Sequence, residues 1–271
     1  MTSSARRLLT ALIGAVVAIS FAAAAASAQA PPQGTPPPGA NDFDCKLTKG
    51  HTRPVVLVHG TFGDMSISWN LISPALVADG YCVFALDYGN RGTGPIQDSA
   101  AQLDDFIDRV LRETGARKVA IVGHSQGGMM PRYYMRFLGG KREVAELIGL
   151  VPSNHGTTSP GALLVPNCEA CRQQAAGSDF LKKLNAGDES PGRRVSFTQI
   201  TTRNDQVVIP YTSAFLKGRR RKTTNIVVQD RCPSDRTDHI GIIYDRVALQ
   251  IVENALRRPG LPAKKRFQPD C

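Results

Sequence analysis

Residues 119–128 are Val-Ala-Ile-Val-Gly-His-Ser-Gln-Gly-Gly, a short apolar run that leads into the pattern Gly-x-Ser-x-Gly. The apolar run predicts a buried strand, and the segment after the glycines predicts a helix. A serine between such a strand and helix lies on a sharp turn, whose glycines let neighbouring backbone pack against the corner. Because this turn displays its hydroxyl at the carboxyl edge of a sheet, Ser125 is predicted to be a nucleophile.

Apolar segments and helical periodicity alternate along the rest of the chain. Strands are predicted over residues 54–58, 81–86, 119–122, 147–151, 195–201 and 225–229. Helices are predicted over 69–78, 97–113, 129–138, about 180–184, and 242–256, with a slight kink at Pro131 and Tyr244 on the apolar stripe of the last. Mostly continuous apolar strands indicate a sheet covered on both faces. The chain is therefore predicted to be a single α/β domain with a doubly wound, mainly parallel six-stranded sheet.

The first 28 residues have the composition of a signal peptide. Arg6-Arg7 gives a basic start, residues 8–26 are almost wholly apolar, and Ala26-Ser27-Ala28 is a small-x-small cleavage site. A membrane anchor is the alternative, because the apolar run is long enough to span a bilayer. The paired arginines leave both general and twin-arginine export open. Residues 29–44 are rich in Pro and Gly and predict a disordered tail before a domain over 45–271.

All six cysteines lie after the predicted signal peptide, and their even number predicts three disulfides in a secreted protein. Six cysteines allow fifteen pairings. Cys168 and Cys171 also resemble half of a zinc or redox motif, but no second pair has matching spacing, so a local disulfide is preferred. Our hypothesis for the rest is Cys45 with Cys82 and Cys232 with Cys271.

The formal net charge is +10, and basic runs at 219–222 and 264–266 carry much of the excess. We interpret these runs as solvated surface, and transient contact with anionic lipid or cell-wall surfaces is the alternative. They carry no interleaved aromatic residues, so nucleic acid is not expected as a partner. The sequence contains no metal-ligand cluster or acidic calcium loop, so neither a metal nor a cofactor is expected.

A serine hydroxyl needs a base within hydrogen-bond reach, and the base needs a third group to orient it. His239 follows the sixth predicted strand, and Asp205 lies just beyond the carboxyl end of the fifth. His155 is nearer in sequence, but no aspartate lies between Ser125 and His155, whereas this architecture has the order nucleophile, acid, base. Asp238 would point away from the adjacent His239. We therefore predict that Asp205 orients His239 as the base for Ser125.

The reaction's oxyanion also needs hydrogen-bond donors. The residue after the nucleophile, Gln126, offers its backbone N–H at a helix start. The loop after the first strand brings the backbone N–H of Thr61 to the same edge. Phe62, Ile209, Tyr211 and Ile240 are expected to line an acyl groove near this edge.

Four short segments together resemble the secreted bacterial lipase class 2 family. They are His59-Gly60, Gly123 to Gly128, Asn204-Asp205 and Asp238-His239-Ile240-Gly241, and the similarity covers roughly residues 54–256. The resemblance implies an α/β-hydrolase that needs no metal and hydrolyses carboxylic esters of acylglycerols. It also implies a triad of Ser125, Asp205 and His239 with an oxyanion hole at the backbones of Thr61 and Gln126.

This chain departs from the small lidless lipase of bacilli in its six cysteines and in a longer insertion over residues 154–194. It looks closer to larger actinobacterial members, and the insertion leaves open whether the site has a lid. Our hypothesis is a secreted, monomeric serine ester hydrolase, a triacylglycerol lipase or carboxylesterase, that acts on lipid esters. The alternatives are a short-chain esterase, a polyester hydrolase or an acyltransferase with the same triad and, more remotely, a non-catalytic surface-binding module.

Overall fold

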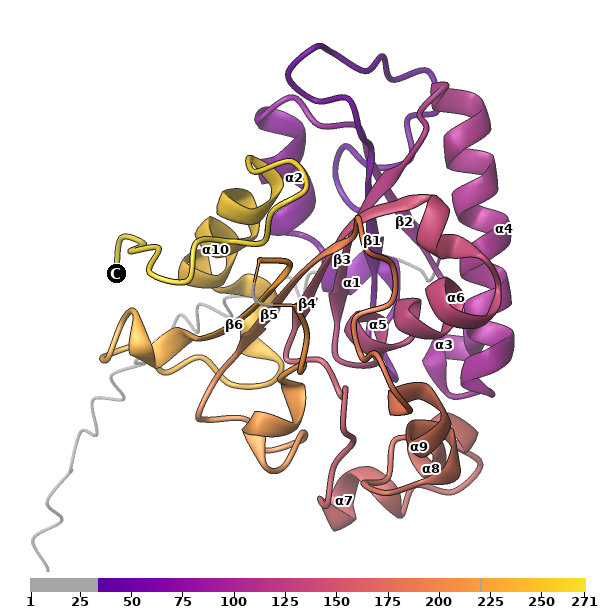
Figure 1. Cartoon of the computed structure of the whole chain (residues 1–271), viewed down its shortest axis with the longest axis vertical. Helices are drawn as coiled ribbons and strands as arrows, with labels where there is room; N and C mark the ends of the chain where they lie inside the picture. The colour runs from indigo at the N-terminus through magenta and orange to yellow at the C-terminus, as the bar shows by residue number, and fades with distance from the viewer. Residues whose placement is uncertain (1–33, 220) are drawn as a thin grey trace, which may run out of the picture. The chain divides into compact units, whose positions relative to one another are not determined.

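Six parallel strands form one sheet at the centre of the protein, with the order β2-β1-β3-β4-β5-β6 (Figure 1). The computed structural model describes residues 34–219 and 221–271, so the predicted signal peptide lies outside the described residues. The strands are β1 (Val55–Val58), β2 (Val83–Leu86), β3 (Val119–His124), β4 (Val144–Leu150), β5 (Ser196–Thr201) and β6 (Thr223–Val227). All six predicted strands are present, and the prediction of a parallel sheet is confirmed.

Two apolar cores cover the two faces of the sheet, because alternate side chains of each strand point to opposite faces. In β1, Val56 and Val58 belong to one core, and Val55 and Leu57 belong to the other. The first core packs under α4 (Ile96–Thr114) and α6 (Pro131–Phe137), and the second under α2 (Ile72–Ala78) and α10 (Arg246–Leu256). Figure 1 shows these two pairs of helices on opposite sides of the sheet, as the doubly wound prediction requires.

The remaining helices are short. They are α1 (Met65–Ser68), α3 (Gly89–Gly92), α5 (Gln126–Met129), α7 (Pro160–Leu163), α8 (Glu169–Gln173) and α9 (Asp179–Asn185), with 3-10 turns η1 (Gly140–Arg142), η2 (Tyr211–Ala214), η3 (Val228–Asp230) and η4 (Gly241–Tyr244). In the part of the chain that the structure describes, no helix combines the length and apolar character that a membrane crossing requires.

Two helices begin later in the chain than the sequence predicts. The predicted helix over 242–256 was wrong in its first turn, because Asp245 is extended and its carboxylate accepts the backbone N–H of Ala248, so that α10 begins at Arg246. Tyr244 consequently lies outside the apolar stripe and is 48% exposed. The predicted helix over 69–78 begins only at Ile72, since the separate helix α1, which Asp64 caps, ends at Ser68, and Trp69 has non-helical backbone angles of φ −127° and ψ 18°.

Part of the predicted disordered tail is held against the sheet. The side-chain amide of Asn41 donates to the carbonyl of Ala85 over 2.9 Å and accepts its N–H over 2.8 Å, and the backbone N–H of Asn41 donates to Val83. The prediction of disorder is therefore wrong for residues 34–44.

Disulfides join Cys45 to Cys82, Cys168 to Cys171 and Cys232 to Cys271, which are the pairs of our hypothesis.

Glu146 is a buried carboxyl group in β4. Its side chain is 2% exposed and lies 3.1 Å from the guanidinium of Arg53. Burial raises the pKa of Glu146 from 4.5 to about 8, and the half-buried Arg53 offsets only part of this effect. The pKa of Glu146 is higher in the folded state than in the unfolded state, so folding favours its protonated form. The resulting contribution to the free energy of unfolding is fully present below pH 4.5 and is lost as the pH rises through about 8.

Replacement of Glu146 by Gln is expected to remove this pH dependence. Between pH 5 and pH 9 the wild-type free energy of unfolding should fall more than that of Glu146→Gln, by on the order of 2 kcal/mol. Urea unfolding at the two pH values measures the difference, with the exposed Glu113→Gln as the control. Equal pH dependence in the wild type and Glu146→Gln would contradict the prediction.

Candidate active site

The turn at Ser125 joins the end of β3 to α5 with backbone so closely packed that side chains cannot enter. Ser125 has a φ of 53° and a ψ of −121°, a strained conformation for a residue with a side chain. A Cβ atom on Gly123 would lie 1.9 Å from the carbonyl oxygen of Gly127, and one on Gly127 would lie 2.1 Å from that of Val58. The two glycines therefore allow the turn that lifts the hydroxyl above the sheet, as the sequence predicts.

Ser125, His239 and Asp205 form a continuous line of hydrogen bonds at the carboxyl edge of the sheet. The Oγ of Ser125 lies 3.1 Å from Nε2 of His239, and Nδ1 of His239 lies 2.9 Å from Oδ2 of Asp205. The three residues are 6%, 2% and 8% exposed, respectively. A hydroxyl, an imidazole and a carboxylate in this order can deprotonate the hydroxyl and stabilise the imidazolium that results.

Two loops hold Asp205 and His239 in place. Asp205 follows β5, and its second oxygen accepts the backbone N–H groups of Val207 and Val208 over 2.9 and 2.7 Å. His239 follows η3, and a β-bridge between Asn204 and Asp238 joins the two loops. Both carboxylate oxygens of Asp205 are thereby engaged, and only one of them faces the imidazole. The side chain of Asp205 cannot rotate without losing three hydrogen bonds.

The alternative residues named from the sequence are directed elsewhere. His155 places Nε2 at 3.2 Å from Glu189 and Nδ1 at 3.1 Å from the carbonyl of Ser213, so both ring nitrogens have partners away from Ser125. Asp238 accepts the backbone N–H groups of Ile240 and Gly241 and does not contact the ring of His239. The structure thus brings together the sequence-predicted trio and leaves these two residues outside it.

His124 supports the backbone of His239, a contact that the sequence did not reveal. Its Nε2 donates to the carbonyl of His239 over 2.8 Å, and the two rings lie 5.0 Å apart. Burial, and next the nearby His239, lower the pKa of His124 to about 3. His124 is therefore neutral at physiological pH and does not repel a protonated His239.

The backbone N–H groups of Thr61 and Gln126 are free to bind an anion beside Ser125. Neither donates to an acceptor among the described residues. The backbone of Gly60 passes so close that a Cβ atom there would lie 3.1 Å from Cβ of Ser125, which brings Thr61 to the same place. Gln126 is the first residue of α5, where N–H groups point out of the helix.

Gln174, from the insertion, connects these two donor residues through their side chains. The hydroxyl of Thr61 donates to Oε1 of Gln126 over 2.9 Å, and Nε2 of Gln174 lies 3.0 Å from each of these two oxygens. This buried triangle positions the loop after β1 against the start of α5. Sequence analysis missed Gln174, because a lone polar residue in an irregular segment carries no recognisable pattern.

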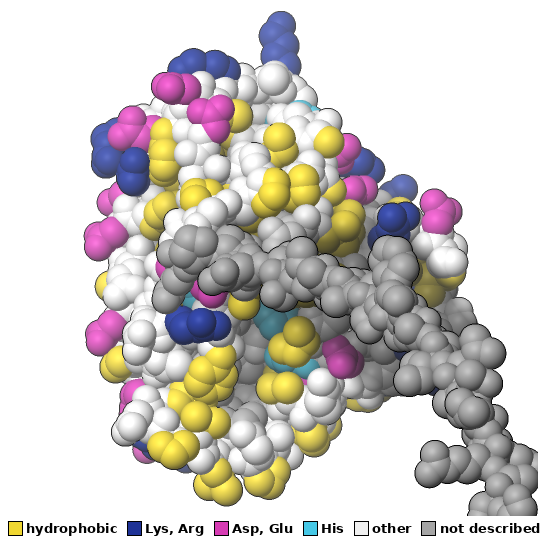
Figure 2. All heavy atoms as spheres, turned by 180° about the vertical axis from the view of Figure 1, so that it is seen from behind, with side chains coloured by type: hydrophobic (Ala, Val, Ile, Leu, Met, Phe, Trp, Pro, Cys, Tyr) yellow, Lys and Arg dark blue, Asp and Glu magenta, His cyan; other side chains and the backbone are white. Residues whose placement is uncertain are grey.

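A cavity of about 380 Å³ opens above Ser125. Its lining includes Thr61, Phe62, His124, Ser125, Ser153, Thr157, Ser159, Gly161, Leu163, Cys171, Gln174, Gln206, Val207, Val208, His239 and Ile240. The insertion therefore forms one wall, and α7, α8 and α9 lie beyond the end of the sheet (Figure 1). Figure 2 shows hydrophobic side chains around exposed histidine atoms on one face of the molecule.

Two of the four predicted groove residues are in the cavity lining and two are not. Phe62 and Ile240 line the cavity and are 46% and 54% exposed. Ile209 and Tyr211 do not belong to the lining of this cavity, whereas Val207 and Val208 of the same loop do. Tyr211 packs edge-on against Phe215, with ring centroids 6.3 Å apart.

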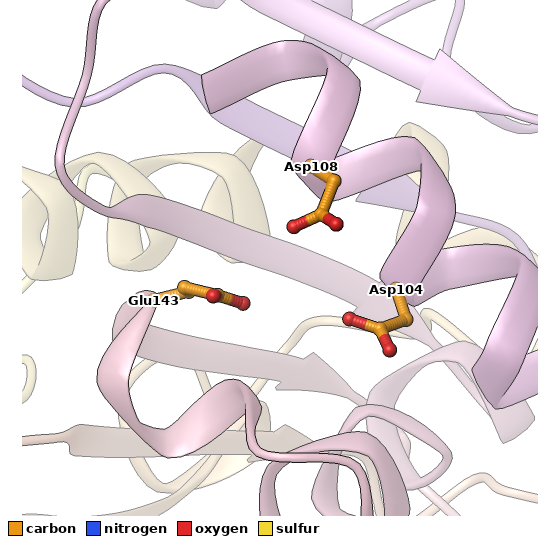
Figure 3. A group of neighbouring side chains, drawn as sticks. All are labelled: Asp104, Asp108 and Glu143. Carbon is orange, nitrogen blue, oxygen red and sulfur yellow. The ribbon is translucent and has the colours of Figure 1, made fainter. Parts of the chain in front are cut away.

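An acidic cluster of Asp104, Asp108 and Glu143 lies away from this site. Figure 3 shows the two aspartates one turn apart on α4 and Glu143 just before β4, with the three carboxylates facing one another. Glu143 accepts a hydrogen bond from the hydroxyl of Tyr134. Burial and the neighbouring carboxylates raise the pKa of Asp104. The cluster lies at the amino end of β4, whereas Ser125 follows the carboxyl end of β3, so it has no part in this site.

Residues 52–252 match the family described as lipase (class 2). The chain belongs to the lipase class 2 family. The resemblance inferred from four short segments is therefore confirmed, over nearly the residues expected. This member of the family is also 37% identical over 92 residues to triacylglycerol lipases of Pseudarthrobacter phenanthrenivorans and Burkholderia plantarii. Each match covers 30% of this chain but only 27% and 24% of the relatives, so the chain spans about a quarter of their length.

Solved structures confirm the predicted α/β-hydrolase fold of this class 2 family member. Lipase B of Aspergillus fumigatus superposes with a TM-score of 0.73 at 21% identity, over 85% of this chain and 57% of that one. The mature lipase BlEst2 of Bacillus licheniformis gives a TM-score of 0.62 at 17% identity, over 84% and 96%. At these identities the likeness establishes the fold.

Replacement of His239 and of His155 should have opposite results. His239→Ala is expected to lower kcat for ester hydrolysis by on the order of 10⁴-fold, because Ser125 loses the only ring within reach of its hydroxyl among the described residues. His155→Ala, the control, should retain near wild-type kcat, because its ring contacts Glu189 and Ser213. Steady-state kinetics with a soluble p-nitrophenyl ester measures both, and an inactive but folded His155→Ala would contradict the choice of base.

Proposed function

We propose that this chain is a serine hydrolase that cleaves carboxylic esters of lipids through an acyl-enzyme on Ser125. The observation that carries the proposal is the buried line of hydrogen bonds from Ser125 through His239 to Asp205. Membership in the lipase class 2 family supports the same chemistry. Because the trio lies at the base of a partly apolar cavity, the reacting hydroxyl and a bound acyl group would meet there.

The geometry supports the following sequence of bond changes. Oγ of Ser125 attacks the acyl carbonyl while Nε2 of His239 takes its proton, and Asp205 stabilises the imidazolium. The new C–O⁻ accepts hydrogen bonds from the N–H groups of Thr61 and Gln126. His239 then gives its proton to the departing alkoxide, and the alcohol leaves. Water, deprotonated by His239, attacks the acyl-enzyme, and the carboxylic acid product is released as Ser125 regains its proton.

The cavity lining favours an apolar acyl group. Phe62, Leu163, Val207 and Ile240 supply hydrocarbon surface along its walls. Burial of each methylene contributes about 0.8 kcal/mol. The triacylglycerol lipases among the relatives, by their names, act on such esters. We therefore assign triacylglycerols and similar lipid esters as the substrate class, in preference to short-chain esters.

We also propose that the protein is exported. Three disulfides connect all six cysteines, and such bonds form and persist in oxidising compartments. The signal peptide proposed over residues 1–28 would direct this export.

Ser125→Ala tests the proposed nucleophile. The variant should lose on the order of 10⁴- to 10⁶-fold in kcat, because it lacks the atom that forms the acyl-enzyme. A fluorophosphonate probe should label the wild type at Ser125 and leave the variant unlabelled, as intact-protein mass spectrometry would show. Circular dichroism checks that the variant is folded. Retained ester hydrolysis in a folded Ser125→Ala would refute the assignment.

A series of p-nitrophenyl esters tests the proposed substrate class. From acetyl to octanoyl, kcat/KM should rise by up to about fourfold for each added methylene that the cavity buries. Ile240→Ser, in the cavity lining, should reduce this rise, whereas Ile209→Ser, equally apolar but outside the lining, should not. Hydrolysis of an emulsified triglyceride should follow the same order. A maximum at acetyl or butyryl esters would favour the short-chain esterase instead.

A further inference from the structure

A large basic groove lies at the edge of the sheet opposite to Ser125. It has a volume of about 1220 Å³ and is lined by residues within 47–53, 115–118, 141–142 and 192–194 and by Arg219. These segments come immediately before β1, β3, β4 and β5 and shortly before β6, respectively. Because all five strands are parallel, the groove runs along their amino ends, whereas Ser125 follows the carboxyl end of β3.

The groove has a strong excess of positive charge. Nine of its lining residues are Lys or Arg, and none is Asp or Glu. Arg53 and Arg219 are paired with Glu146 and Asp188. The other seven form no ion pair with a carboxylate within residues 34–219 and 221–271. Burial, and next the guanidinium groups of Arg194 and Arg53, lower the pKa of Lys118.

Stabilisation by the end of helix α4 explains the position of only some of these cations. α4 ends at Thr114, and the partial negative charge at its end favours nearby cations such as Arg117 and Lys118. The other cations come from four separate connections that share no helix end with α4. The end of α4 therefore does not explain why cations from these other connections converge on one groove.

The lining chemistry favours phosphate groups on an extended chain. Six of the nine cations are arginines, whose planar guanidinium matches phosphate oxygens in pairs. The groove follows five adjacent strands, a distance of about 19 Å at the usual spacing between strands. Several anionic groups of one chain can therefore bind at the same time. The lining contains no aromatic residue on which a nucleobase could stack.

We propose that the basic groove binds a linear phosphate polyanion without bases, such as inorganic polyphosphate or a phosphodiester polymer of a cell surface. Two features disfavour a lipid bilayer as the partner. The groove is concave, and an enzyme attached to a bilayer through this edge would hold Ser125 and its cavity away from the lipid. Attachment to a polymer leaves the opposite edge free, so the enzyme can be retained at a surface while its cavity stays accessible.

Binding of the full mature chain to long-chain inorganic polyphosphate tests the proposal. The groove variant is Lys141→Ser with Arg193→Ser and Arg194→Ser, three exposed residues that form no ion pair with a described carboxylate. The control is Lys264→Ser with Lys265→Ser and Arg266→Ser, which removes the same charge from an exposed run outside the groove. The groove variant should bind at least about tenfold more weakly and show a shallower dependence of log Kd on log salt, and the control should change little.

Three further measurements make the result decisive. Arg193→Lys with Arg194→Lys should bind more tightly than the groove variant but more weakly than the wild type, because the charge is retained and the paired guanidinium contacts are lost. Hydrolysis of a soluble ester should be unchanged in the groove variant, which shows that the fold and the distant Ser125 are intact. Equal losses in the groove variant and the control, or no binding of polyphosphate by the wild type, would overturn the proposal. So would tighter binding to single-stranded DNA or to phosphatidylglycerol vesicles than to polyphosphate.

Discussion

Close backbone contact at the turn after β3 is the constraint on which the rest of the site depends. The N–H of Ser125 donates to the carbonyl of Leu150 in β4, and Gly127 packs against the carbonyl of Val58 in β1. The turn is therefore held by both neighbours of β3 in the sheet. No side chain larger than hydrogen fits at Gly123 or Gly127, so the strained conformation of Ser125 persists only because the surrounding sheet imposes it.

The other parts of the site are positioned around this turn. The parallel sheet brings the loops after β5 and η3 to the same edge, where Asp205 and His239 complete the line of hydrogen bonds. The insertion contributes Gln174, which ties the loop after β1 to the start of α5, and it also forms a wall of the cavity. A segment that is irregular in sequence is thus tied to the centre of the site. Lys and Arg side chains from five connections lie at the opposite edge of the sheet. One edge therefore carries the Ser125 site and the other a basic groove.

Strong local patterns predicted most of the fold and the central residues of the site. Buried strands are continuous apolar runs, and the order of Ser125, Asp205 and His239 along the chain excluded His155 before any geometry was known. Predictions of helix ends, of the tail and of the cavity lining depended on local contacts and turns that the sequence pattern does not reveal. Asp245 ends one helical turn and starts another, Asn41 binds β2 and orders part of a Pro-rich tail, and Val207 and Val208, not Ile209 and Tyr211, line the cavity. Each of these depends on a single side chain or a single turn, which leaves no periodic signal.

The sequence by itself determined the family, the parallel sheet and the trio at its carboxyl edge, because these follow from a motif, from hydrophobic runs and from chain order. Tertiary structure alone decided which side chains line the cavity, that Gln174 joins the two backbone donors, and that Lys and Arg residues from five distant segments converge on one groove. The physical reason is the range of the interactions. Burial and backbone geometry act on neighbouring residues and leave a pattern in the chain, whereas contacts between loops far apart in sequence exist only once the sheet has brought their ends together.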